Sequence, residues 1–349
     1  MKTLALATLT GHGLWLPMTA FLLLGVLIFA VASRLARAAD AIADATGLGR
    51  AWIGVVLLAG STSLPEITTD VNAALLDVPD IGVGDLMGST LANMLILALL
   101  DLVYARRRIL QSVVINHAVV GLLAIALTMI AGIAISSGGF GRLGPVGIET
   151  ILIAAAYLMG MRVFYRLTRV AAQGLIPDDP AAAAAARPAE DNRKRLRRAA
   201  WTFALAAAAL IVIAPLLVIS AEAVSAESGM SETFVGTLLV GLTTSFPEIA
   251  ATVAAVRLGA VDLAVGNIFG SNAFNMCVLL FMDLSYTRGP LLAEVSSAHV
   301  MSAQLAVLCM SLGVLGIMNR LEKRSAITRF GSLLIVACYA ASIWLLSRG

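Results

Sequence analysis

Long apolar runs alternate with short polar connections along this chain. Ten runs are nearly free of charge and reach the length of about 20 residues that a helix needs to cross the hydrocarbon core of a bilayer. They cover residues 14–33, 50–76, 81–102, 112–135, 145–168, 199–221, 231–256, 260–284, 295–318 and 326–347. The pattern predicts an all-α integral membrane protein with ten transmembrane helices. A mean hydropathy of +0.94 and a charged fraction of 13% agree, because they leave too little polar surface for a water-soluble domain.

The sequence contains an internal repeat. Residues 61–94 align with residues 243–276 without a gap, at a constant shift of 182 positions, and both copies contain Thr-Ser-x-Pro-Glu and end in Asn-Met. We therefore expect a first repeat of five spans at 1–169, a basic linker at 170–198 and a second repeat at 199–349. Five is an odd number, so the second repeat enters the membrane upside down relative to the first. Two inverted five-helix repeats are the plan of many secondary transporters.

The distribution of Lys and Arg predicts the orientation in the membrane. The connections after spans 1, 3, 5, 7 and 9, span ends included, hold 20 of the 24 basic residues. By the positive-inside rule these connections are cytoplasmic and both termini lie outside, as in a multi-pass protein of the plasma (inner) membrane. The linker 170–198, with RKRLRR at 193–198, is then cytoplasmic. Its basic cluster fits attraction to anionic lipid better than nucleic-acid binding.

Each copy of the repeat places a proline and a glutamate inside an apolar span: Pro65 with Glu66, and Pro247 with Glu248. Proline removes a backbone donor and leaves carbonyls of the preceding turn to bond hydroxyls, water or a cation. A threonine lies one turn before each glutamate, so hydroxyl, carboxylate and carbonyl oxygens share one helix face. Such an all-oxygen set suits hard cations such as Ca²⁺ and Na⁺.

The next span of each repeat supplies further oxygen atoms. Ser89 with Asn93, and Ser271 with Asn275, stand four residues apart and therefore on one helix face. Glycines beside them permit close helix packing. No Lys or Arg lies near the midplane of a predicted span to pair with the glutamates, which favours a cation site over a buried ion pair. The three cysteines and three histidines form no metal or disulfide pattern.

These motifs resemble the cation/calcium antiporter superfamily, specifically its sodium/calcium exchanger branch. That branch carries G-T-S-x-P-E on the second and seventh spans and G-N-x-x-G-S-N on the third and eighth, here within 59–94 and 241–276. The resemblance implies that Glu66 and Glu248 are the central ligands and that Asn93 and Asn275 occupy the other two midplane positions. It also implies flanking Na⁺ sites lined by Thr62, Ser63, Ser89, Thr244, Ser245 and Ser271, with the carbonyls of Ala59 and Gly241.

Several positions depart from the family pattern. They are Ser61 and Thr243 in place of glycine, Thr90 in place of the asparagine that matches Asn272, Asp85 where the second copy has Asn267, and Asp70 where the second copy has Thr252. Both midplane amides are neutral, although many relatives have an aspartate at one of them. With Asp70 expected in a vestibule outside the ligands, the site has a formal charge of −2 from its two glutamates. Such a charge predicts exchange nearer to electroneutral than in relatives that move several Na⁺ per Ca²⁺.

The expected function is antiport of Ca²⁺ against Na⁺ by alternating access, with no cofactor beyond the transported ions. Coupling of Ca²⁺ or another divalent cation to H⁺ is the alternative, since glutamates can release protons instead. An intramembrane hydrolase would use Ser63 or Ser245, but no histidine or lysine accompanies either serine as a base. A channel is the remaining rival, and saturable flux that requires a counter-ion excludes it. The sequence leaves the oligomeric state open.

Overall fold

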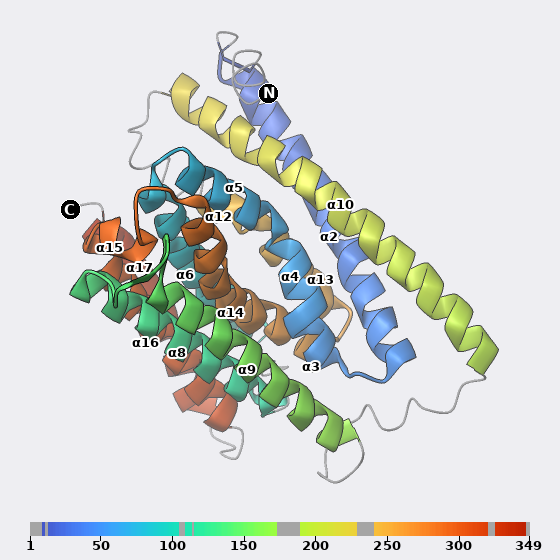
Figure 1. The fold of residues 1–349 in the computed structure, drawn as a ribbon. Helices are drawn as coiled ribbons and strands as arrows, with labels where there is room; N and C mark the ends of the chain where they lie inside the picture. Colours follow the sequence, from blue (N-terminus) through green and yellow to red (C-terminus); the bar gives the residue numbers. More distant parts are fainter. Residues whose placement is uncertain are drawn as a thin grey trace.

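A computed structural model describes residues 9–10, 13–104, 109–113, 115–172, 189–228, 241–319 and 325–346. This part of the chain is helical throughout its length apart from connections and one short hairpin (Figure 1). The hairpin pairs β1, Arg142–Leu143, with β2, Val146–Gly147, in antiparallel register. The predicted all-α class is therefore confirmed.

The helices follow the predicted apolar runs in order. Their bounds are α2 Trp15–Thr46, α3 Arg50–Ile53, the π-helix η1 Gly54–Leu58, α4 Ala59–Thr62, α5 Leu64–Leu75, α6 Pro79–Val103, α7 Ile109–Ser112, α8 Asn116–Ser137, α9 Ile148–Ala172, α10 Ala189–Ser228, α12 Gly241–Thr244, α13 Phe246–Arg257, α14 Val261–Ser285, α15 Leu291–Glu294, α16 Ala298–Met318 and α17 Ser325–Leu346.

Seven helices of the described part are long and apolar enough to cross a membrane, and the bent run from α3 to α5 makes an eighth. The expected seventh span, 231–256, includes residues 231–240, which lie outside the described residues. The expected tenth span, 326–347, corresponds to α17. Within α17, the apolar stretch Phe330–Trp344 is shorter than the seven helices counted here. The total of ten spans in two repeats therefore stays a prediction.

α2 and α10 form a long pair along one side of the molecule (Figure 1). They run in opposite directions, so the start of α10 lies beside the end of α2. There the side chain of Asn192 donates a hydrogen bond to the carbonyl of Ala45 at 2.9 Å. A shift of 182 positions carries α2 onto α10. Opposite directions for corresponding helices fit the inverted relation that the sequence predicts.

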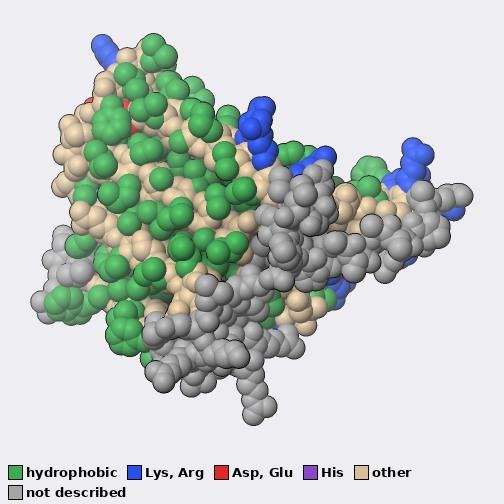
Figure 2. Space-filling view, turned by 90° about the horizontal axis from the view of Figure 1, so that it is seen from below, with side chains coloured by type: hydrophobic (Ala, Val, Ile, Leu, Met, Phe, Trp, Pro, Cys, Tyr) green, Lys and Arg blue, Asp and Glu red, His purple; other side chains and the backbone are tan. Residues whose placement is uncertain are grey.

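Both of these helices extend beyond the predicted spans 14–33 and 199–221. α2 continues to Thr46, and the basic run 193–198, expected within the linker, forms early turns of α10. Of the expected linker, residues 173–188 lie outside the described residues. The apolar face in Figure 2 has Lys and Arg side chains at its margins, as expected of a chain that presents an apolar belt to lipid.

α14 lies in the middle of the helix bundle and is buried along most of its length. Its glycines allow η1 to approach closely. A Cβ atom on Gly270 would stand 2.7 Å from the carbonyl oxygen of Val55, and a Cβ atom on Gly54 would stand 2.7 Å from that of Leu263. Larger residues at Gly54 and Gly270 would force the two backbones apart. Gly270 therefore serves helix packing, as the sequence suggests, and Gly54 of η1 has the same role.

Both proline-glutamate motifs lie where a helix breaks. α4 ends at Thr62 and α5 begins at Leu64, with a bend of 47° between the flanking helices. In the second half α12 ends at Thr244 and α13 begins at Phe246. Proline is the second residue of each new helix, where its missing N–H leaves no hydrogen bond unmade. The glutamate that follows is held in the first turn, near the positive end of the helix dipole.

Two histidine-aspartate contacts link the two halves, and in each the histidine and the aspartate come from opposite halves. Nε2 of His117 at the start of α8 lies 3.1 Å from Oδ1 of Asp262 on α14, and Nε2 of His299 at the start of α16 lies 3.0 Å from Oδ1 of Asp80 on α6. The shift of 182 positions carries each pair onto the other with its partners exchanged. The His117 side chain is fully buried, whereas the Asp80 side chain is 53% exposed.

His117→Ala is expected to lower the free energy of unfolding by about 2 kcal/mol, because a fully buried side chain loses its hydrogen bond to a carboxylate. The matched variant His299→Ala removes a more exposed contact and should cost less than about 1 kcal/mol. Unfolding of the purified protein in increasing SDS, followed by circular dichroism, measures both. Equal losses in the two variants would show that burial does not decide the strength of these contacts.

Candidate cation-binding site

The two helix breaks come together inside the protein. Glu66, in the first turn of α5, is 1% exposed, and Glu248, in the first turn of α13, is 0% exposed. α6 and α14 pack against both of these broken helices. Residues that the sequence singles out in both repeats therefore line one buried region.

Serine hydroxyls hold the glutamates, partly across the boundary between the halves. Ser89 donates to Oε1 of Glu66 at 2.7 Å, and Ser245 of the second half lies 3.5 Å from the same oxygen. Ser63 of the first half donates to Oε1 of Glu248 at 3.0 Å.

The serines also contact one another. Ser63 and Ser271 stand 3.2 Å apart, and Ser245 and Ser89 stand 3.0 Å apart, between their hydroxyl oxygens. The four predicted serines thus form two hydrogen-bonded groups, Ser89 and Ser245 with Glu66, and Ser63 and Ser271 with Glu248.

Several oxygen atoms of this region are buried without any protein partner. They are Oε2 of Glu66, Oε2 of Glu248, Oδ1 of Asn93 and Oδ1 of Asn275, whose Nδ2 is also unpartnered. A buried polar group without a partner costs about 1–3 kcal/mol, and more if it is charged. Carboxylate and amide oxygens are ligands that Ca²⁺ and Na⁺ favour, so a hard cation is the partner that fits them.

The described residues contain no group of three or more His, Cys, Asp or Glu side chains placed to hold a metal ion. A cation bound between Glu66 and Glu248 therefore depends on neutral hydroxyl, amide and carbonyl oxygens for the rest of its ligands. Mixed neutral and charged oxygen ligands suit reversible binding better than a permanent structural metal, because fewer ligand charges mean lower affinity.

The two predicted threonines bond differently. Thr62 lies 3.1 Å from the carbonyl oxygens of Leu58 and Ala59 and 3.3 Å from Oδ1 of Asn267. Thr244 donates to Oδ1 of Asp85 at 3.0 Å. Each threonine therefore reaches the third span of the opposite half, at positions related by the shift of 182.

The predicted backbone ligands lie about one turn before the same breaks, at the first residues of α4 and α12. The carbonyl of Ala59 accepts from the backbone N–H of Ser63 at 3.1 Å, which occupies one of its lone pairs. Gly241 is the first residue of α12. Of the two predicted midplane amides, the side chain of Asn93 donates to Oδ1 of Asn272 at 2.9 Å, whereas the side chain of Asn275 has no hydrogen-bond partner in the protein.

Asp70 and Asp85 form a second acidic pair that the sequence did not assign to the site. Asp70 is fully buried and neither carboxylate oxygen has a hydrogen-bond partner. Its carboxyl group lies beside that of Asp85. Two ionised carboxylates only accept hydrogen bonds, so this contact cannot satisfy either group without a shared cation or proton. The pair lies one helical turn from the Glu66–Ser89 contact on the same two helices.

The second half has a neutral pair at the matching positions. Asn267 donates through Nδ2 to the hydroxyl of Thr252 at 2.9 Å, which satisfies both groups. The sequence contains a sign of this pair, because the first copy of the repeat has Asp70 and Asp85 where the second copy has the neutral residues Thr252 and Asn267. The count of acidic groups at the site therefore changes, because Asp85 contacts the predicted ligand residue Thr244 and Asp70 contacts Asp85.

Other buried acids have ordinary structural roles. Asp283 accepts from the backbone N–H groups of Gly147 and Leu291, each at 2.8 Å, and Asp101 accepts from the N–H of Leu110 at 3.2 Å. These contacts fix the hairpin before α9 and the connections that follow α14 and α6. No Lys or Arg is buried among the described residues, so basic side chains do not neutralise the acids at the helix breaks.

The family model of the sodium/calcium exchanger protein matches the chain twice, at residues 16–166 and 198–348. The two matches are related by the same shift of 182 positions. They include both helix breaks and nearly all the helices described above.

Two curated relatives match along most of their length. The protein CaxA of Alkalimonas amylolytica is 29% identical over 313 residues, which cover 87% of this chain and 93% of the relative. Inner membrane protein YrbG of Escherichia coli (strain K12) is 29% identical over 273 residues, which cover 78% of this chain and 80% of the relative. The match to both spans most of the molecule.

The fold is also that of a solved protein. A structure of the sodium-calcium exchanger NCX_Mj, soaked with 10 mM Na⁺ and zero Ca²⁺, superposes with a TM-score of 0.70 and 22% sequence identity. The match covers 95% of this chain and 99% of that chain. The two chains therefore share one fold.

Proposed function

Because this chain belongs to the sodium/calcium exchanger protein family, we propose that it exchanges Ca²⁺ for Na⁺ across the membrane. The single observation that carries the proposal is the buried group around Glu66 and Glu248, in which one oxygen of each carboxylate has no protein partner. A hard cation supplies the missing partner for both carboxylates. The site is proposed to lie near the midplane of the bilayer.

Ion exchange needs a site that opens to one side of the membrane at a time. Each glutamate is contacted by a serine of the opposite half, and each stands at a break between two helices. Interrupted helices of two related halves that meet at one site are the arrangement through which secondary transporters alternate access. We assign Glu66, Glu248, Asn93 and Asn275 to the Ca²⁺ position.

The flanking positions are proposed for Na⁺. Their ligands are the hydroxyls of Thr62, Ser63, Ser89, Thr244, Ser245 and Ser271, with the carbonyls of Ala59 and Gly241. The hydroxyls of the four serines already lie next to a glutamate or to one another, so small movements suffice to aim their oxygens at a monovalent ion.

Coupling to H⁺ is the second candidate, and Asp70 and Asp85 favour it. Two adjacent buried carboxyl groups can share a proton, which turns an unfavourable contact into a hydrogen bond. The neutral pair Thr252 and Asn267 offers no such proton site in the other half.

One flux measurement separates the two. Purified protein in proteoliposomes is loaded with Na⁺ and diluted into Na⁺-free medium that contains radioactive Ca²⁺, and a second set of vesicles carries a pH gradient instead. Na⁺ exchange predicts uptake driven by the first gradient and saturating with Ca²⁺. Uptake driven only by the pH gradient would establish H⁺ coupling, and flux that needs no counter-ion would indicate a channel.

The chain is a multi-pass membrane protein, and we expect it in the inner membrane with both termini outside. Single cysteines placed at 180–192, in a background without the native Cys277, Cys309 and Cys338, are expected to react with a membrane-impermeant thiol reagent only in inverted vesicles. The positive-inside bias is the reason. Labelling in intact spheroplasts would reverse the proposed topology, and with it the side assigned to every connection.

A further inference from the structure

A basic cavity lies between α2 and α10, away from the site of the two glutamates. Its volume is about 230 Å³, and its lining includes four arginines, Arg34 and Arg37 from α2 with Arg195 and Arg198 from α10. The other lining residues are three alanines and a threonine. Small side chains leave room beside the two helices, and no acidic residue lines the cavity.

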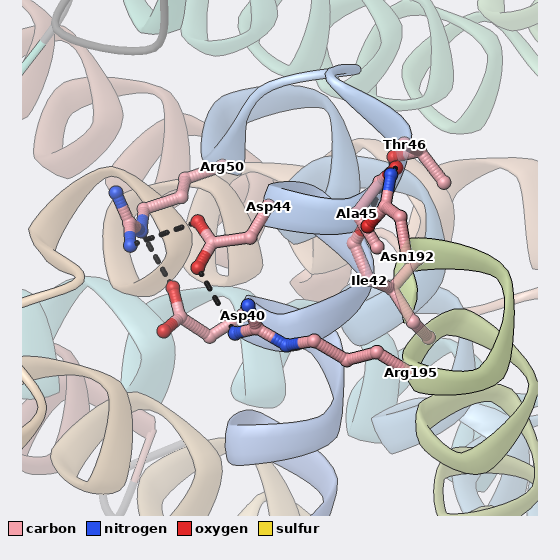
Figure 3. A network of polar contacts seen from close by, with 8 residues as sticks. All are labelled: Asp40, Ile42, Asp44, Ala45, Thr46, Arg50, Asn192 and Arg195. Atoms are coloured by element: carbon pink, nitrogen blue, oxygen red, sulfur yellow. Dashed lines mark hydrogen bonds and ion pairs between the residues drawn. The ribbon is translucent and has the colours of Figure 1, made fainter. Parts of the chain in front are cut away.

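Most of this positive charge is unpaired. Arg195 reaches Oδ2 of Asp44 at 3.4 Å, but Asp44 also binds Arg50, as Figure 3 shows. Within the described part of the chain no ion pair involves Arg34, Arg37 or Arg198. Concave clusters of arginine recognise phosphate because the planar guanidinium offers two parallel N–H donors to its oxygens.

The cavity stands at one edge of the apolar belt. Between Lys2 and Arg34, and again between Arg198 and Glu222, the sequence contains no Lys, Arg, Asp or Glu. Both helices therefore enter the hydrocarbon at the level of the cavity. Trp201, 65% exposed, lies at the same level on α10, where indole rings favour the interface between headgroups and hydrocarbon.

Apolar stripes lead from the cavity into the membrane. Leu23 and Leu27 are exposed on α2 and lie on the helix face that carries Arg34, at spacings of four and seven residues. Leu205, exposed on α10, lies seven residues after Arg198 on the corresponding face. A ligand with a phosphate at the arginines would find apolar surface directly beside it.

We propose that this cavity binds the phosphate headgroup of an anionic phospholipid, whose acyl chains lie along the exposed apolar faces of α2 and α10. Free inorganic phosphate shares the headgroup chemistry but gains nothing from those apolar faces. A bound lipid joins arginines of corresponding helices from both halves. The assignment is independent of the ions that the protein exchanges.

The test compares two double variants that lose the same charge. Arg34→Gln/Arg198→Gln removes one cavity arginine from each helix, whereas Arg193→Gln/Arg197→Gln removes two exposed arginines of α10 that do not line the cavity. Full-length protein is placed in nanodiscs of phosphatidylcholine with increasing phosphatidylglycerol, and lipid that co-purifies after delipidation is measured by mass spectrometry.

The wild-type protein and the Arg193/Arg197 control are expected to retain phosphatidylglycerol and to unfold at higher temperature as its fraction rises. The cavity variant should bind this lipid with an affinity lower by roughly tenfold or more. Arg37→Gln, a milder exposed change, repeats the comparison if the double variant fails to fold. Equal losses in cavity and control variants, or equal stabilisation by inorganic phosphate in phosphatidylcholine alone, would overturn the proposal.

Discussion

Glu66→Gln and Glu248→Gln, made one at a time, are each expected to abolish Ca²⁺ transport while the protein still folds. Glutamine keeps the shape of the side chain and can still accept from Ser89 or Ser63, but it deletes one of the two charges that face the proposed cation. Loss of one partner of a buried charge pair costs about 3–5 kcal/mol, so Ca²⁺ affinity should fall by about two orders of magnitude or more. Calorimetric titration and vesicle flux measure both effects.

Glu294→Gln is the matched control, since it makes the same change at an exposed position of α15. It should leave Ca²⁺ binding and transport unchanged. Near wild-type exchange by either Glu66→Gln or Glu248→Gln would remove the two glutamates from the proposed site, whatever the control does.

The double variant Asp70→Thr/Asp85→Asn is expected to weaken Na⁺ activation of Ca²⁺ transport by more than tenfold. It gives the first half the neutral pair that the second half already has in Thr252 and Asn267, which satisfy each other by a hydrogen bond. At an effective dielectric constant of 20, a charge on the order of 8 Å from a cation contributes about 2 kcal/mol. The variant removes two carboxylates that lie one helical turn from the Glu66–Ser89 contact. The Na⁺ concentration that gives half-maximal flux is the quantity to measure.

The same variant tests the charge balance of exchange. The expectation of nearly electroneutral exchange rested on a formal charge of −2, with Asp70 outside the ligands. Asp70 lies beside Asp85, which accepts from Thr244, so four carboxylates belong to the neighbourhood of the proposed ion site. Wild-type flux should then depend on a membrane potential set with valinomycin and K⁺, and the double variant should depend on it less. Identical voltage and Na⁺ dependence in both proteins would show that the pair takes no part in exchange.

The repeated motif made much of the candidate site predictable. Proline followed by glutamate in an apolar run requires a break and a buried charge together, so Glu66 and Glu248 could be singled out without any structure. The crossing of Ser63 to Glu248 could not be predicted. Spacing along one helix shows which side chains share a face, but contacts between elements far apart in the chain are set by packing of the whole bundle.

Hydropathy predicted where apolar helices lie along the chain better than where they end. α2 continues to Thr46 and α10 begins at Ala189, well outside the apolar runs. The residues added are mostly Ala, Arg, Lys and Glu, which favour helices in water as well. A fall in hydropathy along the sequence marks where a helix leaves the hydrocarbon. The helix itself can continue until a cap ends it, as Gly47 with its left-handed backbone does for α2.

The crosswise serine contacts make an unloaded return of the transporter costly. Ser63 holds Glu248, and Ser245 approaches Glu66, only while the two halves keep their present relation. A sliding of one half past the other would break both contacts together and leave two anionic groups short of donors in a medium of low polarity. A cation that binds both carboxylates offsets that loss and can travel with the movement. We therefore expect little slippage without cargo in the proposed exchange, so that the gradient of one ion is not dissipated without moving the other.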